Sequence, residues 1–374
     1  MVGASARVGS PGNEALVNLR KCGYKGALYA VNPRGDAGEG IACYASLPDL
    51  PAIPEHVVIA VGDRHVEEVL GQVIALGVKA ASLFSALQLE DDAQPPLRER
   101  VRQQALDSGL LLHGANCMGL FNFRDGDWLY GFDTRQHGRG GHVALLSQAG
   151  AGMSGILDCE ERLDFCFAAS TGQELCLSVE DYLDYVLDLA DVGVVGLFLE
   201  TSRKPQLLLA ALQKAQRKNV PIVVLKVGRT ALSARLAVSH SGAIAGTDAS
   251  YQAVFDRYGV QRVDDMAQLA SALIMFSRSG PVGGGALVSL HDSGGERQLA
   301  IDLADALGVR LAELSNTTVE KLEQLLDPGL PAINPLDAGG AGGEAAAQNM
   351  ADCVTTVWAD PGAALGAVVH DRAP

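Results

Sequence analysis

The sequence predicts an α/β fold in which parallel sheets recur along the chain in tandem domains. Short apolar runs of strand length alternate with helical patterns, and glycine-rich turns separate them. The apolar runs are continuous rather than alternating, which is typical of strands that helices cover on both faces. The chain has 374 residues, 43 of them glycine, and 48% of its residues are hydrophobic. A chain of this size is expected to fold as two or three domains, each with its own core.

The first segment has the element order of a nucleotide-binding unit. Val2 to Ser5 is the end of a strand entering a tight turn, and a helix follows from about Asn13 to Cys22. A second strand, Ala27 to Val31, leads to Asn32-Pro33-Arg34. The glycine spacing is not a strict G-x-G-x-x-G, and no acidic residue ends the second strand to bind a ribose. Arg34 at that place favours a phosphate over a bare ribose hydroxyl.

Three more strands complete this first domain, which we place at residues 1–125. They are predicted at His56 to Val61, Ala80 to Phe84 and Leu110 to His113, with helices between them. The turn Gly114 to Gly119 then lies at the carboxyl end of the last strand, where such folds bind ligands. Cys117 in that turn is a candidate nucleophile, but no basic partner is near it in sequence, which favours a buried filler. The polar, glycine-rich stretch 122–141 is interpreted as a linker or an irregular loop, and we place the first domain boundary there.

The second domain, residues 126–279, supplies a predicted phosphate site and a carboxylate. The strand His142 to Leu146 runs into Ser147, Gln148, Ala149 and Gly150, which open a helix. Hydroxyl, amide and glycine before a helix can hold a phosphate. The strand Val194 to Leu199 delivers Glu200 at its carboxyl end, and the strand Ile222 to Val227 leads toward His240.

His240 is the residue around which we organise the functional hypothesis. It lies among small residues, with Ser241 and Gly242 directly after it, and a helix with Asp248 as its expected N-cap follows. A neutral imidazole is a competent nucleophile, and small neighbours let a phosphoryl group approach. Taken alone, a loop histidine between serines is more often a surface residue. Glu200 and the Ser147 turn favour the catalytic interpretation.

A third segment, residues 280–374, has the same alternating pattern. A strand is predicted at Ala286 to Leu290, a helix at Glu296 to Leu307 and a strand at Ala364 to Val369. The sequence stops directly after that strand and starts with almost no first strand, so we expect both ends to be truncated. His291 competes with His240 because it precedes a glycine-rich turn, but no strand ending in a carboxylate accompanies it. A structural role in the turn is favoured for His291.

Composition excludes several classes of function. The net charge of −15 argues against non-specific nucleic-acid binding. No apolar run reaches about 18 residues, and no signal peptide opens the chain. The seven cysteines form no C-x-x-C pair, and the eight histidines show no metal-binding spacing. We therefore expect a reduced cytoplasmic protein with no metal site of its own and no nucleic-acid or membrane partner.

Taken together, these segments resemble the NDP-forming (ADP-forming) acyl-CoA synthetases, which are relatives of the succinyl-CoA synthetase α subunit. The resemblance covers nearly the whole chain and depends on six short motifs in order: 2–5, 31–33, 116–119, 147–150, 199–200 and 239–246. Three further stretches, 172–174, 181–185 and 255–259, are similar to a branch that includes feruloyl-CoA synthetase-like proteins.

The resemblance implies a Rossmann-like CoA-binding domain followed by flavodoxin-like domains of the succinyl-CoA synthetase type. It implies that His240 is phosphorylated by ATP and that Glu200 hydrogen-bonds its imidazole. The phosphoryl group would be held by the turn at Ser147, Gln148, Ala149 and Gly150, with Ser241 and Gly242, and by a helix of the partner. Coenzyme A would contact the turns that contain Gly3, Ala4, Ser5, Asn32, Pro33, Arg34, Val61, Gly62, Ser85 and Asn116.

The resemblance also implies what this chain needs from elsewhere. No ATP-grasp domain is recognisable, so ATP or ADP with Mg²⁺ would bind on an ATP-grasp domain or β subunit, either fused or separate, in an oligomeric enzyme. Ala149 stands where the family often has a second serine, which removes one phosphate hydrogen bond. The sequence leaves open the small carboxylic acid substrate, the choice of ATP or GTP and the direction of the reaction.

Two other classes of function compete with the ligase. A non-catalytic CoA-binding regulatory module of a fused acetyltransferase would also lack an ATP-grasp domain, but it would have no need of His240 with Glu200. A nicotinamide dehydrogenase is disfavoured by the loose glycine spacing and the missing ribose-binding acid.

Overall fold

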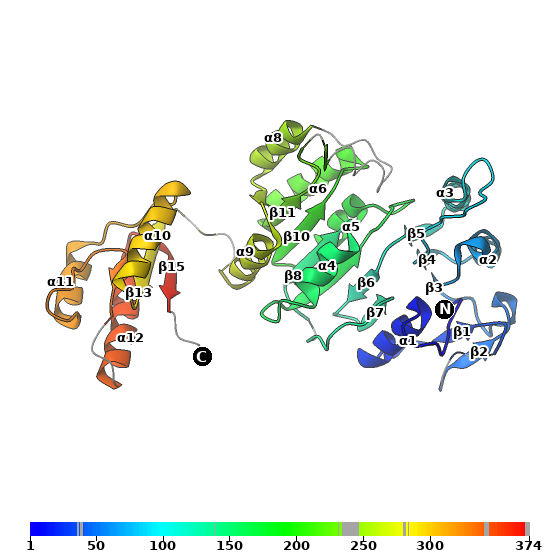
Figure 1. The fold of residues 1–374 in the computed structure, drawn as a ribbon, viewed down its shortest axis with the longest axis horizontal. Coiled ribbons are helices and arrows are strands. Elements are labelled where there is room, and N and C mark those ends of the chain that lie inside the picture. Colours follow the sequence, from blue (N-terminus) through cyan, green and yellow to red (C-terminus); the bar gives the residue numbers. More distant parts are fainter. Residues whose placement is uncertain are drawn as a thin grey trace. The chain divides into compact units, whose positions relative to one another are not determined.

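The computed structural model describes residues 1–35, 37, 40–138, 140–230, 232–233, 247–279, 282, 284–339 and 344–370. The chain divides into two compact units, Met1–Pro281 and Val282–Pro374. Figure 1 shows the helices and strands of each unit, which are described separately below.

The first unit opens with a parallel sheet in the Rossmann order. From one edge to the other, its strands are β2 (Ala42–Tyr44), β1 (Tyr29–Val31), β3 (His56–Ile59), β4 (Ala80–Leu83) and β5 (Leu111–Gly114). Val2 forms parallel bridges to both Val31 and Ile59, so the first residues fill the place between β1 and β3. Every neighbour in this sheet is parallel, as the sequence predicts.

Among the described residues, helices α1, α2 and α3 and the 3-10 turn η1 accompany this sheet, and the local sequence marks the start of α1 and the end of α3. Ser10 caps α1 by accepting a hydrogen bond from the Asn13 N–H, and Gly109 ends α3 with a φ of 70°. Apolar residues of α2 and α3 pack with the strands in one buried core. The bounds are α1 (Pro11–Lys21), η1 (Leu47–Asp49), α2 (Asp63–Ala75) and α3 (Leu97–Ser108).

A second, seven-stranded sheet follows in the same unit, in the order β12-β11-β10-β8-β9-β6-β7. The five strands from β12 to β9 are parallel and have the flavodoxin-like order. The other two strands, β6 and β7, form an antiparallel edge. The bounds are β6 (Gly119–Asn122), β7 (Asp127–Tyr130), β8 (Val143–Ser147), β9 (Phe165–Ser170), β10 (Val194–Leu199), β11 (Ile222–Lys226) and β12 (Gln261–Val263).

Helices cover both faces of the second sheet (Figure 1). α4 and α9 pack on one face, while α5, α6 and α8 cover the other. Helices on both faces explain why β8 and β11 are buried along their whole length. The bounds are α4 (Gly150–Leu157), α5 (Val179–Val186), α6 (Pro205–Lys218), α8 (Asp248–Tyr258) and α9 (Met266–Ser279).

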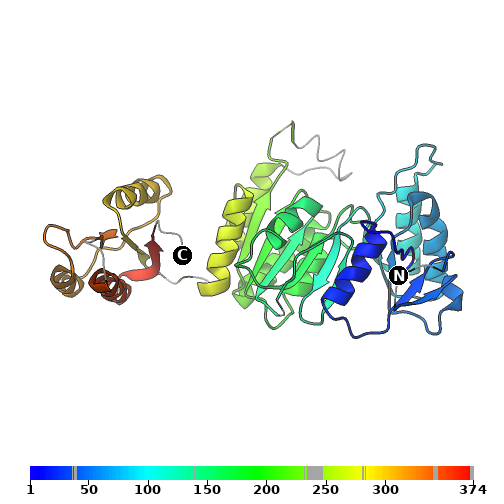
Figure 2. The same cartoon turned by 60° about the horizontal axis from the view of Figure 1, so that its bottom comes forward.

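Two local expectations from the sequence are wrong. The stretch 122–141 is not only a linker, because Asn122 and Asp127–Tyr130 belong to the β6–β7 hairpin at the edge of the second sheet. Helix α1 contacts β7, so this hairpin also joins the first part of the unit to the second (Figure 2). The N-cap of α8 is Thr247 rather than Asp248, whose carboxylate lies 2.5 Å from a guanidinium nitrogen of Arg262.

The second unit is a smaller parallel α/β arrangement. Its sheet has the order β14-β13-β15, and Leu311 adds a single parallel bridge to Leu287. Ser315 caps α11 by accepting a hydrogen bond from the Thr318 N–H. The bounds are β13 (Ala286–His291), α10 (Gly294–Ala306), α11 (Asn316–Leu325), β14 (Leu336–Asp337), α12 (Glu344–Trp358) and β15 (Ala363–Val369).

The helices of the described ranges include none that combines the length and the apolar character needed to cross a membrane.

Candidate functional site

The predicted nucleophile cannot be placed. His240, Ser241 and Gly242 lie outside the described residues. The structure does describe the strand before this segment, which ends at Lys226, and the helix after it, which begins at Asp248. The site is therefore built from the predicted carboxylate, the predicted phosphate turn and the predicted CoA turns.

The turn at the start of α4 is closely packed. β8 ends at Ser147 and α4 begins at Gly150, so the turn runs from a buried strand directly into a helix N-terminus. The Ser147 hydroxyl is directed into the turn, where it donates a hydrogen bond of 2.5 Å to the main-chain oxygen of Ala149. A Cβ at Gly150 would lie 2.5 Å from the Met118 sulfur, so only glycine fits there with this packing. With the Ser147 hydroxyl directed into the turn, the groups that remain to meet the predicted phosphate are the main-chain N–H groups at the helix N-terminus.

Gln148 connects this turn to the strand end that carries Glu200. Its Oε1 accepts hydrogen bonds from the N–H groups of Glu200 (2.7 Å) and Thr201 (2.9 Å). Its Nε2 donates to Glu174 Oε2 and to the Thr201 oxygen, both at 2.8 Å. The amide of Gln148 is thus fixed on both sides, and the sequence motif alone did not predict this role.

Glu174 anchors the other end of this network. It is buried, with a φ of 54°, and its carboxylate accepts hydrogen bonds from Thr171 Oγ1 and from the Val179 N–H. Arg203 Nε lies 2.8 Å from Glu174 Oε2. Burial raises the pKa of Glu174, with a further contribution from the Glu180 carboxylate. Because its hydrogen bonds cross from one strand end to the next, Glu174 holds Gln148 in place.

Glu200 follows β10 directly and is 7% exposed. Next to it, Lys226 at the end of β11 is 2% exposed, and its ammonium group donates hydrogen bonds to the main-chain oxygens of Glu200 and Val227. The Lys226 nitrogen also lies 4.6 Å from the centre of the Tyr251 ring. Burial lowers the pKa of Lys226 to about 8. The sequence signal for this residue, which we missed, is a lysine that ends an otherwise apolar strand.

The first two of the predicted CoA turns are hydrogen-bonded to each other. Asn32 Nδ2 donates to the Ala4 oxygen at 2.8 Å, and Asn32 Oδ1 accepts from the Arg34 N–H. Gly3 has a φ of 83°, and a Cβ there would lie 2.4 Å from the Ala60 oxygen. Glycine at position 3 therefore allows the close approach of two chain segments at this turn.

The remaining predicted CoA turns are also joined. Ser85 Oγ donates to the Val61 oxygen at 2.5 Å, and the Asn116 N–H donates to the Ser85 oxygen at 2.9 Å. Asp63, which follows Gly62, accepts hydrogen bonds from the N–H groups of Leu87 and Gln88. These contacts bring the strand-end turns of the first sheet together at one edge.

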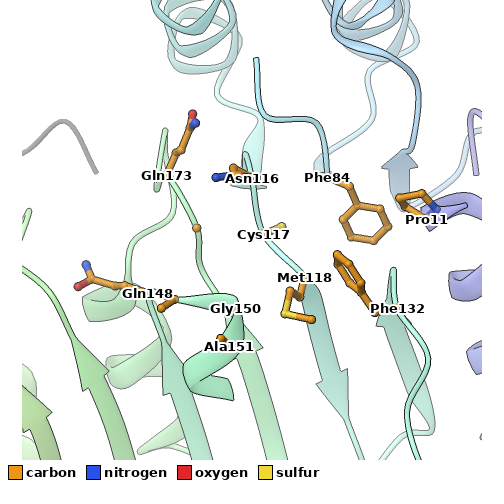
Figure 3. Close-up of a pocket in the computed structure, with 12 residues that line it drawn as sticks. Pro11, Phe84, Asn116, Cys117, Met118, Phe132, Gln148, Gly150, Ala151 and Gln173 are labelled. Atoms are coloured by element: carbon orange, nitrogen blue, oxygen red, sulfur yellow. The ribbon is translucent and has the colours of Figure 1, made fainter. Parts of the chain in front are cut away.

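A cavity of about 310 Å³ lies between Asn116 and the start of α4 (Figure 3). It therefore adjoins one predicted CoA residue and the predicted phosphate turn. Its lining residues are Pro11, Phe84, Asn116, Cys117, Met118, Phe132, Gln148, Ala149, Gly150, Ala151, Gly172 and Gln173. Phe84 and Phe132 had no place in the sequence prediction.

The two alternative reactive side chains, Cys117 and His291, are both buried. Cys117 is buried, and burial raises its pKa to about 12, so its thiol stays protonated near neutral pH. His291 in the second unit is also buried and lies 3.0 Å from the Ser289 hydroxyl. Across the ranges that the structure describes, no three His, Cys, Asp or Glu side chains are grouped as metal ligands.

Comparison with known proteins assigns domains to both parts of the first unit. Residues 1–122 match the family model of a CoA binding domain, and residues 140–276 match that of the succinyl-CoA ligase like flavodoxin domain.

Two curated relatives align with most of this chain. The chain is 30% identical over 339 residues to the acetate–CoA ligase (ADP-forming) of Methanocaldococcus jannaschii, covering 90% of this chain and 47% of that protein. It is 28% identical over 345 residues to a trans-feruloyl-CoA synthase of an unknown prokaryotic organism, covering 90% of this chain and 48% of that protein. The chain thus spans about half the length of these relatives.

A solved structure shares the fold. The dinucleotide forming acetyl-coenzyme A synthetase 1 of Ca. Korarchaeum cryptofilum, in complex with phosphate and ADP, matches with a TM-score of 0.86 at 24% identity. The match covers 99% of this chain and 79% of that one.

Proposed function

The chain belongs to the NDP-forming (ADP-forming) acyl-CoA synthetase family, related to the succinyl-CoA synthetase α subunit, and we propose that it forms the CoA-binding and phosphoryl-carrying part of such a ligase. The reaction makes acyl-CoA from a carboxylic acid, CoA and ATP. The observation that carries this proposal is the Gln148 amide, which hydrogen-bonds the Glu200 segment from within the phosphate turn. Gln148 and Glu200, which are 52 residues apart in sequence, are thereby held side by side.

CoA binds at the edge of the first sheet, at the turns of Gly3 to Ser5, Asn32 to Arg34, Val61-Gly62, Ser85 and Asn116. The hydrogen bonds Asn32–Ala4 and Ser85–Val61 support this assignment because they hold the strand-end turns together. Such turns are where open α/β sheets bind nucleotides. The exposed Arg34 supplies a positive charge for a CoA phosphate.

His240 carries the phosphoryl group between substrates. Its ring nitrogen attacks the γ-phosphorus of ATP, the bond to the bridging oxygen breaks, and ADP leaves. A carboxylate oxygen of the acid then attacks this phosphorus, which gives an acyl phosphate and frees His240. Finally the CoA sulfur attacks the acyl carbon, phosphate leaves, and the thiol proton goes to solvent. The same steps in reverse make ATP.

Glu200 orients the histidine for the first step. A carboxylate that accepts a hydrogen bond from one imidazole nitrogen fixes the tautomer and leaves the other nitrogen free to attack. The α4 turn, from Ser147 to Gly150, offsets the phosphoryl charge with main-chain N–H groups, with Ser241 and Gly242 contributing from the histidine loop. Main-chain donors suit a protein whose net charge is −15.

ATP or GTP would bind on an ATP-grasp domain or β subunit, fused or separate, and a Mg²⁺ ion held there would neutralise charge on the transferring phosphate. Supporting this, the chain spans about half the length of the relatives named above. We expect the complete enzyme to be an oligomer. The alternative, a regulatory module of an acetyltransferase, is not favoured because both relatives are ligases or synthases.

Calorimetric titration tests the CoA site directly. We expect the full chain to bind CoA with measurable heat and NAD without it, because Arg34 rather than a carboxylate stands at the end of the second strand. Binding of NAD with no heat from CoA would contradict the proposal.

A further inference from the structure

The segment that leaves β7, residues 130–137 (the strap), lies between the two ranges that match family models, 1–122 and 140–276. It contacts a helix from each of them: α1 of the CoA binding domain, and α4, which begins at the predicted phosphate turn. Pro11 at the start of α1 and Gly150 at the start of α4 line the same cavity (Figure 3). The two helices therefore begin close to each other, and the strap is attached nearer their other ends.

The first attachment of the strap is to α1. Asn18 is fully buried, and its Nδ2 donates hydrogen bonds of 2.8 Å to the main-chain oxygens of Tyr130 and Phe132. Lys21, in the last turn of α1, donates to the Thr134 oxygen at 2.5 Å. Main-chain oxygens that lose such a donor inside a protein are costly, so the strap is held firmly against α1.

The second attachment is to the C-terminal end of α4. Arg135 donates from Nε to the Leu157 oxygen and from Nη2 to the Glu160 oxygen, both at 3.2 Å. The Thr134 hydroxyl donates to the carboxylate of Asp158, the residue that follows the helix. A guanidinium at a helix C-terminus pairs with main-chain oxygens and offsets the negative end of the helix dipole. The end of α4 is thus held by the strap.

The strap is also fixed to the core between its two attachments. His137 is 7% exposed, and its ring lies 5.4–5.8 Å, centre to centre and edge-on, from the rings of Phe121, Phe123 and Trp128. Its Nε2 lies 2.8 Å from the Thr134 hydroxyl. Aromatic packing of this kind favours one arrangement of the rings, so a shift at one end of the strap is passed to the other.

Helix α1 is joined in turn to the first predicted CoA turn. Asn13 Nδ2 donates to the Ser5 oxygen at 3.0 Å. A Cβ on Gly12 would lie 2.3 Å from the Gly3 oxygen, so the helix and the turn are in direct main-chain contact. A continuous series of contacts therefore runs from this turn through α1 and the strap to α4.

We propose that the strap couples the two sites, so that CoA bound at the edge of the first sheet stabilises α4 and with it the predicted phosphate turn. This inference rests on the proposed function, from which it takes the CoA site. Lys21 and Arg135 are positioning residues, one at each attachment, and neither lines the cavity. The coupling keeps the phosphate turn ordered when the CoA sulfur has to meet the acyl phosphate.

The physical basis is a difference in CoA affinity between two states of the chain. Local opening of α4 breaks the hydrogen bonds of the strap, and a loosened strap no longer holds α1 and the CoA turn. CoA therefore binds the closed state more tightly than the open one and makes the opening of α4 rarer.

Amide hydrogen exchange of the full chain, measured by mass spectrometry with and without saturating CoA, tests the coupling without a partner subunit. In the wild type we expect CoA to slow exchange in the last turn of α4, residues 154–158, by about tenfold, within the usual range of coupling between sites. Helix α6, on the opposite face of the second sheet, is the internal reference and should change little. Equal slowing in α6 would indicate global stabilisation and would overturn the inference.

Arg135→Met and Lys21→Met each remove one attachment of the strap. In both variants we expect the effect of CoA on α4 exchange to fall toward none. The dissociation constant for CoA, measured by calorimetry, should stay within about twofold of the wild-type value, because the open state is rarely populated. Arg135→Lys, which keeps a donor at this attachment, should retain part of the effect. Exchange in α6 without CoA shows that each variant is folded.

Arg162→Met is the matched control, because Arg162 pairs with the Glu160 carboxylate at 2.7 Å near the same end of α4 and is not part of the strap. It should show the wild-type effect of CoA. Two results would overturn the inference and leave the proposed function standing: CoA binds without slowing α4 exchange, or it slows exchange in Arg135→Met and Lys21→Met as much as in the wild type. Absence of CoA binding would contradict the proposed function and the inference together.

Discussion

The ammonium nitrogen of Lys226 lies 2.7 Å from the main-chain oxygen of Glu200 and donates a hydrogen bond to it. The same nitrogen donates to the oxygen of Val227. One buried side chain thus connects the residue that follows β10 with the residue that follows β11, and those strand ends lead to the predicted carboxylate and to the predicted nucleophile. The distance between the ends of β10 and β11 is therefore set by the Lys226 hydrogen bonds to main-chain oxygens, and these bonds involve no predicted catalytic atom.

Lys226→Met should lower the rate of His240 phosphorylation and destabilise the first unit. The substitution keeps an unbranched side chain but leaves two main-chain oxygens without their donor, at a cost of about 1–3 kcal/mol for each buried group. The checks are urea denaturation and labelling by ATP with the ATP-grasp partner.

Lys214→Met is the control for Lys226→Met, because Lys214 pairs with Asp184 and Asp188 on α5 and the turn after it. Loss of that ion-pair cluster should cost about 1 kcal/mol or less. A phosphorylation rate in Lys226→Met equal to the wild-type rate would remove the positioning role.

Gln148→Glu should be more damaging than its small change in shape suggests. The new carboxylate oxygen would face Glu174 Oε2 and the Thr201 oxygen, which both accept hydrogen bonds from the Gln148 amide. We expect a loss of about 2–5 kcal/mol in unfolding free energy from buried like charges and unpaired acceptors. Gln103→Glu, on the exposed face of α3 beside Asp107, should cost about 0.5 kcal/mol or less. Equal losses of unfolding free energy in Gln148→Glu and Gln103→Glu would show that the hydrogen bonds of Gln148 do not stabilise the first unit.

The stability of the first unit should fall in mild acid, in part through His113. This histidine is 2% exposed, with Nδ1 2.7 Å from the Tyr182 hydroxyl, and burial lowers its pKa to about 3. Below pH 6.5 the His113 imidazole binds a proton in the unfolded chain but stays neutral in the folded chain. The stabilisation is therefore present above pH 6.5 and is lost as the pH falls, by about 1.4 kcal/mol for each pH unit.

Urea denaturation at pH 7.5, 6.5 and 5.5 measures this contribution. His113→Gln should show a shallower fall than the wild type, whereas His65→Gln, at an exposed position on α2, should follow the wild-type curve. Parallel curves for His113→Gln and the wild type would contradict the assignment.

Glu200→Gln should slow phosphorylation of His240 by about 10–100-fold. A neutral amide accepts a weaker hydrogen bond from the imidazole than a carboxylate does, so it orients the ring less firmly. Single-turnover labelling with the partner supplied measures the rate, and the dissociation constant for CoA reports the first-domain site separately. Asp184→Asn, a surface carboxylate on α5, serves as the control. Equal rates in Glu200→Gln and the wild type would count against the pairing with His240.

Much of the fold could be predicted from local sequence. β10 has the predicted bounds, Val194 to Leu199, because a continuous apolar run followed by a charged residue marks both its burial and its end. The β6–β7 hairpin was missed because its four-residue strands carry little periodic signal and because β6 pairs with β9, far along the chain. Thr247 and Asp248 are both good N-cap residues, and tertiary structure separates their roles: Thr247 accepts the capping hydrogen bond from the Ser250 N–H, while Asp248 contacts Arg262.

The candidate site was predicted where it follows a strand end and missed where it depends on distant contacts. Glu200 and Gln148 lie at strand ends that the sequence marks, and the structure joins them by hydrogen bonds. The roles of Lys226 and Glu174 depend on partners 26 to 29 residues away, which no local pattern reveals. Phe84 and Phe132 follow different strands, β4 and β7, and line the same cavity only through tertiary packing.

Phosphate labelling of His240 tests the central claim most directly. The full chain and an ATP-grasp partner are incubated with labelled ATP, and wild type is compared with His240→Ala. We predict label on the wild type alone, stable in base and lost in acid, as for a phosphoramidate. Label that persists in His240→Ala, or that resists acid as a phosphoserine on Ser239 or Ser241 would, contradicts the account.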